Sequence, residues 1–209
     1  MKRLAMHFLG VLAWLAVATA SAADLVEGKD YVRLKNPQPV ETGKKIEVIE
    51  FFSYGCPHCH DLEPILQSWM QKLPPDVQFR RVPVMFQQRW EALAKIYYTL
   101  DAMGDKARLS PEVFKAVHVN GVPLYQDKAF FDWVANHGLD RNRVAEVYAS
   151  FTVNSKFNRA KAQANAYNIQ SVPTMVVDGK FVTGRVEHAA VPAVLDALIA
   201  KARAERTKS

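Results

Sequence analysis

The stretch that decides the fold is IEVIEFFSYGCPHCH, residues 46–60. Five of its first seven residues are β-branched or aromatic, and the run is short, which is typical of a buried strand. Ser53-Tyr54-Gly55 ends this pattern. Pro57 then suits the first position of a helix, because a missing N–H costs nothing there. The sequence therefore predicts a strand, a short loop and a helix, with Cys56 at the N-terminal end of that helix.

The chain has two cysteines, Cys56 and Cys59, and they close a loop of only four residues. A disulfide of that span stabilises a fold by roughly 2 kcal/mol at best, against about 4.7 kcal/mol for a loop of 100 residues. The pair is therefore better explained by chemistry than by stability. Helix N-terminal N–H groups favour an anion, and His58 can add positive charge, so we expect the pKa of Cys56 to lie well below its ordinary value of ~8.5. Cys59, one turn further on, is expected to be the buried, resolving thiol.

Composition places the chain among ordinary globular proteins. It has 209 residues, 49% of them apolar, and 27 Lys and Arg against 21 Asp and Glu, for a net charge of +6. This excludes a disordered, collagen-like or low-complexity chain. The mild basic excess does not by itself indicate a nucleic-acid binder.

Residues 1–23 are expected to be a secretory signal peptide. Lys2 and Arg3 form a positive start, residues 4–18 are almost wholly apolar, and small residues follow up to Ala23. Cleavage is expected after Ala22 or Ala23, and the short apolar segment suits export to a bacterial periplasm. The alternative is an uncleaved anchor, but the apolar run is short against the ~20 residues that a span needs.

Two motifs give the sequence a family resemblance: EFFSYGCPHC at residues 50–59 and SVPT at residues 171–174. With these motifs the chain resembles the DsbA family of thiol oxidases, within the thioredoxin superfamily, from about residue 31 onward. The resemblance implies an α/β thioredoxin fold interrupted by a helical insertion domain. It also implies an acidic thiol and a strongly oxidising disulfide, because the family's founding member combines both. No organic cofactor or metal is implied.

The resemblance assigns roles to five residues of the first motif. Cys56 is the nucleophile, Cys59 the resolving thiol, and His58 tunes Cys56; Pro57 completes the Cys-Pro-His-Cys active site. Glu50, an acid inside an apolar strand, is expected to accept the proton of Cys59. A buried carboxylate has to be paired or protonated, and Arg81 is its expected partner. The alternative for Glu50 is a solvated charge on the strand face.

The second motif implies a substrate-binding loop. Val172 and Pro173 match the family's cis-proline loop, in which the Val172 backbone faces the disulfide and pairs with an extended substrate. Arg185 and His188, in a neighbouring loop, are expected to be solvated surface.

This sequence departs from the family's best-known members beside the active site. Tyr54-Gly55 precedes Cys56 where aromatic residues are expected, and His60 replaces an aromatic residue after Cys59. These changes bear on substrate preference and not on the fold.

The periodicity along the chain predicts a β-α-β half over residues 24–86 and an α-β-β-α half over residues 154–209, separated by a wholly helical stretch over residues 87–153. The resemblance implies that the two halves form one thioredoxin-like domain and that the helical stretch is an insertion domain. Strands are expected at residues 30–34, 46–52, 77–84, 174–177 and 180–183. Helices are expected from residue 57 to about 72 and at 89–103, 110–119 (with Ser110 as N-cap and Pro111 as first residue), 127–136, 140–149, 154–167 and 188–206.

Three other functions fit part of the pattern. Cys56 to His60 also matches the C-x-x-C-H motif of c-type haem attachment, but that leaves the preceding buried strand and the Val172-Pro173 loop unexplained. A zinc site would use the same cysteines and histidines, but closed zinc sites usually take a second, distant ligand pair.

A disulfide isomerase or reductase would share the fold. Those relatives usually carry a dimerisation domain ahead of the core, for which about 20 residues leave no room.

We interpret the sequence as that of a periplasmic protein-disulfide oxidase. It donates the Cys56–Cys59 disulfide to folding exported proteins through a mixed disulfide at Cys56. A membrane DsbB-type, quinone-linked partner is expected to reoxidise the pair, and the protein is expected to be a monomer.

Overall fold

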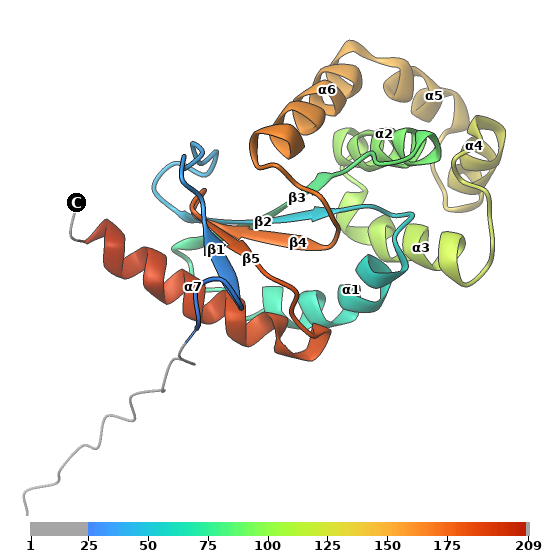
Figure 1. The fold of residues 1–209 in the computed structure, drawn as a ribbon. Helices are drawn as coiled ribbons and strands as arrows, with labels where there is room; N and C mark the ends of the chain where they lie inside the picture. Colours follow the sequence, from blue (N-terminus) through green and yellow to red (C-terminus); the bar gives the residue numbers. More distant parts are fainter. Residues whose placement is uncertain (1–24, 208–209) are drawn as a thin grey trace, which may run out of the picture.

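The computed structural model describes residues 25–207, and the expected signal peptide lies outside them. One mixed sheet has the strand order β1-β5-β4-β2-β3 (Figure 1). β2 runs parallel to β3 and antiparallel to β4. The strands are β1 Tyr31–Arg33, β2 Ile46–Phe52, β3 Val77–Pro83, β4 Thr174–Val177 and β5 Phe181–Thr183.

Helices cover both faces of the sheet. Figure 1 shows α1 and α7 below the sheet and the group α2–α6 above and to the right. Within residues 25–207, no helix is long and apolar enough to cross a membrane. The helices are α1 Pro57–Met70, α2 Gln88–Met103, α3 Lys106–His118, α4 Asp127–Asn136, α5 Arg141–Ala149, α6 Phe151–Ala166 and α7 Val191–Arg206, the last preceded by the 3₁₀ turn η1 His188–Ala190.

β2 is the centre of the fold, because all seven of its residues are buried. Ile49 and Phe51 pack in the core shared with α2–α6, whereas Ile46 and Val48 pack in the core shared with α1 and α7. Burying side chains of this size contributes roughly 1.5–3 kcal/mol each. Two cores therefore fix β2 from opposite faces, and the loop that leaves its end is held in one place.

Most of the expected elements are confirmed. The α/β class is correct, as are the strands at 46–52 and 174–177 and the helix at 127–136. The helix expected at 188–206 opens with the three residues of η1 before α7 begins.

Two predicted helix starts are wrong. α3 begins at Lys106, a turn before Ser110, so that Ser110 and Pro111 lie inside the helix. The cause is tertiary: Leu109 is buried, and the Ser110 hydroxyl bonds the buried Tyr54 hydroxyl. α6 begins at Phe151 and not at residue 154, since the Ser150 side chain caps it by accepting from the Val153 N–H.

Candidate active site

Cys56 lies where strand β2 leads into helix α1. Cys56 is the N-cap residue of α1, with extended backbone angles, and Pro57 is the first helical residue. The Cys56 N–H donates to the Ser53 carbonyl at 3.1 Å, and the Gly55 N–H donates to the Ser53 hydroxyl at 3.1 Å. The predicted placement of Cys56 is confirmed, and its sulfur lies where the first backbone N–H groups of α1 are available.

The two thiols have opposite acidities. Both are free thiols, and both are buried. The pKa of Cys56 is lowered to about 6, first by a hydrogen bond from the Cys59 thiol, against the effect of burial, and further by the backbone N–H groups of Cys59 and His58 and the charge of His58. Burial raises the pKa of Cys59, as do its bond to Cys56 and the nearby Glu50. Near neutral pH the pair therefore holds a single negative charge, on the outer sulfur.

A loop from the other half of the chain faces that sulfur. The Val172–Pro173 peptide bond is cis, as the resemblance implied. The Cys56 sulfur lies 3.5 Å from the Val172 carbonyl and donates to it when protonated. A groove of about 710 Å³ runs from this point between the Val172–Pro173 loop and the loop after β5.

Beneath the cysteines lies a buried cluster of three charges. The Arg81 guanidinium donates to Glu50 at 2.5 Å and to Glu63 at 2.5 Å, and both carboxylates are almost fully buried. Burial raises the pKa of Glu50, against the lowering effect of Arg81. The expected pairing of Glu50 with Arg81 is confirmed, and the alternative of a solvated strand-face charge is wrong.

The sequence analysis missed Glu63, the second carboxylate on Arg81. It lies on α1, one turn after Cys59, between the buried Leu62 and Leu66. The sequence did contain a signal for Glu63: an acid that interrupts the apolar face of a helix needs a buried partner.

Steric contact with Trp90 explains why position 55 is a glycine. A Cβ at this position would lie 2.4 Å from Nε1 and 2.7 Å from Cδ1 of Trp90, which comes from α2. The indole of Trp90 thus fills the space beside the loop in which the family resemblance led us to expect an aromatic side chain. Tyr54 is fully buried, with its ring edge-on to Phe52 and Phe114.

Two histidines outside the motif lie beside it. His188 lines the groove with the exposed His58, and their ring centres are 5.9 Å apart. Arg185, which is exposed, lines the same groove. On α3, His118 lies 5.0 Å from the ring of His60. From the sequence, Arg185 and His188 were expected to be solvated surface, and their place in the same groove as His58 was not predicted. His118 was not identified as a residue near the site.

The chemistry of the arrangement is that of thiol–disulfide exchange. An acidic thiol is a good leaving group in such an exchange, and a partner thiol that stays protonated does not compete with it for the negative charge. Among residues 25–207, no three His, Cys, Asp or Glu side chains are grouped so that they could hold a metal ion.

Comparison with known proteins gives a consistent result. The model of the DSBA-like thioredoxin domain family matches residues 47–195. The thiol:disulfide interchange protein DsbA of Azotobacter vinelandii is 42% identical over 161 residues, which cover 77% of this chain and 75% of the relative. The DsbA of Pseudomonas aeruginosa is 38% identical over 181 residues, covering 87% of this chain and 86% of that one.

Solved structures agree with the sequence relatives. The crystal structure of Pseudomonas aeruginosa DsbA superposes with a TM-score of 0.82 at 38% identity, covering 89% of this chain and 98% of that chain. The structure of DsbA from Xylella fastidiosa gives a TM-score of 0.82 at 30% identity, covering 86% and 98% of the two chains. The expected thioredoxin-like fold is thereby confirmed.

Proposed function

Because this chain belongs to the DSBA-like thioredoxin domain family and is a thiol:disulfide oxidoreductase, we propose that it donates the Cys56–Cys59 disulfide to exported proteins in the periplasm. The observation that carries the proposal is the pair of opposed thiol acidities. A Cys56 pKa of about 6 stabilises the reduced pair near neutral pH, and stabilising the reduced form makes the disulfide more oxidising.

The reaction transfers two electrons from the substrate to the protein. A substrate thiolate attacks the Cys56 sulfur, the Cys56–Cys59 bond breaks, and Cys59 leaves as a thiolate that takes up a proton. A second substrate thiolate then attacks the substrate sulfur of the mixed disulfide, and Cys56 leaves as a thiolate. The substrate gains a disulfide, and the protein is left as the Cys56 thiolate and the Cys59 thiol.

Glu50 is the proposed proton carrier for Cys59. Its negative charge is one of the causes that raise the pKa of Cys59, and burial raises its own pKa, so the two groups compete for a proton in the same buried region. Arg81 holds the carboxylate in place through a bond of 2.5 Å.

Val172 and Pro173 are the proposed substrate contacts. The Val172 carbonyl lies 3.5 Å from the Cys56 sulfur and accepts a hydrogen bond from it only when the thiol is protonated. Neither the Cys56 thiolate nor the disulfide has an S–H to donate, so in both forms this carbonyl is free for the N–H of an extended substrate strand. Pro57 and His58 complete the site: Pro57 begins α1, and His58 adds positive charge beside Cys56.

We also propose the division into a thioredoxin-like domain, residues 24–86 and 154–209, and a helical insertion domain, residues 87–153. A DsbB-type membrane oxidase is the proposed electron acceptor, and the working form is a monomer.

The deciding experiment is the equilibrium potential of the Cys56–Cys59 pair against a glutathione series, followed by tryptophan fluorescence. A value above about −150 mV is expected for a disulfide donor, whereas a value near about −270 mV would assign a thioredoxin-like reductant. The Cys56→Ser variant is the control, since it retains the fold without a redox couple.

The same samples address the c-type haem alternative. Cys59 is fully buried, which leaves a porphyrin no access to both sulfurs, whereas an exchange site needs access to Cys56 alone. We expect no haem absorbance band in protein purified from a host that matures c-type cytochromes.

A further inference from the structure

Helix α3 of the insertion holds the active-site loop at two atoms of one residue. The Tyr54 hydroxyl bonds the Ser110 hydroxyl at 2.6 Å, and the Tyr54 carbonyl accepts from His118 Nε2 at 2.8 Å. Tyr54 is fully buried and lies two residues before Cys56. A contact to its main-chain carbonyl therefore acts on the backbone that leads directly to the nucleophile.

The bond fixes the chemical form of His118. A carbonyl oxygen can only accept, so Nε2 carries the hydrogen. The ring is half-buried beside Phe114, at 6.3 Å and 28° between the ring planes, and His60, at 5.0 Å. Burial and His60 both lower the pKa of His118, against the Tyr54 bond and Asp61, which raise it, and this favours the neutral ring with hydrogen on Nε2.

We propose that His118 is a positioning residue: its ring N–H holds the Tyr54 carbonyl, and the insertion thereby fixes Cys56 where the first N–H groups of α1 meet its sulfur. The path is short. Tyr54 is flanked by Ser53, which accepts from the Cys56 and Gly55 N–H groups, so a displaced Tyr54 displaces both bonds. The inference rests on the proposed role of the Cys56 thiolate.

Substitution of His118 separates its hydrogen bond from its ring. His118→Phe keeps a ring against Phe114 and His60 but removes the donor, whereas His118→Gln keeps an N–H donor without the ring. The Cys56 pKa is read from thiolate absorbance at 240 nm in the reduced protein. We expect His118→Phe to raise it by about one unit, a tenfold change in the thiolate equilibrium, and to lower the potential by about 30 mV. We expect His118→Gln to stay near the wild type.

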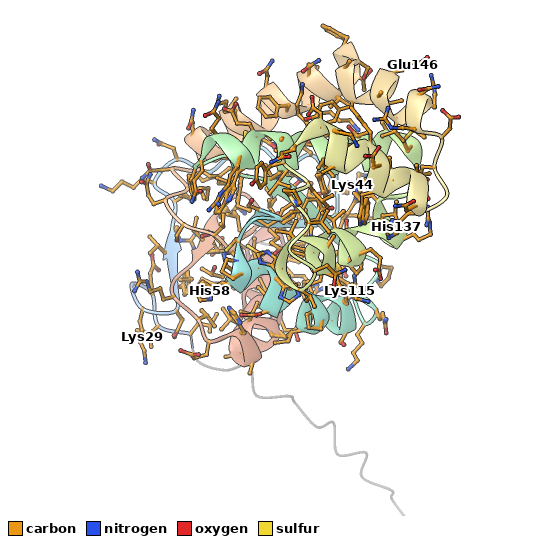
Figure 2. The ribbon with its side chains drawn as sticks, turned by 90° about the vertical axis from the view of Figure 1, so that its right-hand side faces the viewer. Lys29, Lys44, His58, Lys115, His137 and Glu146 are labelled. Atoms are coloured by element: carbon orange, nitrogen blue, oxygen red, sulfur yellow. The ribbon has the colours of Figure 1, made fainter. Side chains whose placement is uncertain are left out.

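His137 provides a matched control. It is half-buried, and its Nδ1 bonds the Trp133 carbonyl at 2.7 Å, so it is also a histidine of the insertion tied to a main-chain oxygen. Figure 2 shows His137 and His58 well apart. His137→Phe is expected to lower stability and to leave the Cys56 pKa unchanged.

Three results would overturn the proposal: an unchanged pKa in His118→Phe, an equal rise in His118→Phe and His118→Gln, or an equal rise in His137→Phe. A wild-type pKa near 8.5 would instead count against the proposed function. If His118→Phe does not fold, nitrogen-15 NMR of the wild type decides. Hydrogen on Nε2 of His118 supports the proposal, and hydrogen on Nδ1 alone refutes it.

Discussion

The Trp90 indole lies against the backbone of Gly55, so closely that a methyl group on Gly55 would come within 2.4 Å of Nε1. Trp90 belongs to α2, and Gly55 belongs to the loop before Cys56. A residue of the insertion thus determines which residue types the active-site loop can carry, and the ring, which is 8% exposed, has little room to move aside.

We therefore expect Gly55→Ala to lower the free energy of unfolding by about 1–3 kcal/mol, the usual effect of overpacking. Denaturant unfolding of the oxidised protein measures it. In a Trp90→Phe background, which lacks Nε1, the same substitution is expected to cost less. If Gly55→Ala lowers the free energy of unfolding equally in both backgrounds, the contact with Trp90 is not what restricts position 55 to glycine.

His58→Ser is expected to make the couple more reducing, because the charge and the backbone N–H at position 58 both help to stabilise the Cys56 thiolate and the substitution removes the charge. A shift of some tens of millivolts is expected, since a tenfold change in the equilibrium is about 30 mV. The glutathione titration measures it. His188→Ser, from the same groove, is the control and is expected to shift the potential less; a potential unchanged in His58→Ser would remove His58 from the mechanism.

Glu50→Gln is expected to flatten the pH dependence of thiol exchange, since the amide cannot take up the Cys59 proton. Stopped-flow exchange with a model dithiol between pH 5 and 9 tests this. Glu63→Gln keeps Glu50 and Arg81 paired and is the control for a general disturbance of the cluster. Identical profiles for wild type and Glu50→Gln would exclude the proton-carrying role.

The stability of the reduced protein is expected to depend on pH through Cys56. A pKa lowered in the folded state gives stability that is present at high pH and lost as pH falls through about 6. Between pH 7 and pH 5 the reduced wild type should lose about 1 kcal/mol relative to Cys56→Ser, whose hydroxyl does not ionise. Parallel urea melts at both pH values provide the comparison, and a constant difference would contradict the acidity of Cys56.

The sequence predicted the parts of the site that local pattern determines. The strand 46–52, the N-cap position of Cys56 and the pairing of Glu50 with Arg81 follow from periodicity, from proline at a helix start and from the cost of an unpaired buried acid. The Val172–Pro173 loop came from family resemblance, because an X-Pro bond is seldom cis on general grounds.

What the sequence did not predict depends on contacts between distant segments. Ser110-Pro111 is a good helix start by composition, yet the bond from Ser110 to Tyr54 and the burial of Leu109 favour a helix that begins a turn earlier. His118 carries no local signal at all. Its role follows only from the placement of α3 beside the loop at Tyr54.

The antiparallel pairing of β2 with β4 has a consequence for how the protein is made. The sulfur of Cys56 and the carbonyl of Val172 are 116 residues apart in the chain, and all of α2–α6 lies between them. Closing so long a loop costs conformational entropy before the contacts between β2 and β4 can stabilise the fold. We expect pulsed hydrogen exchange during refolding to protect β2 and β3 before β4. In that order of events, Cys56 is in place at the end of β2 before the Val172 carbonyl is brought beside it.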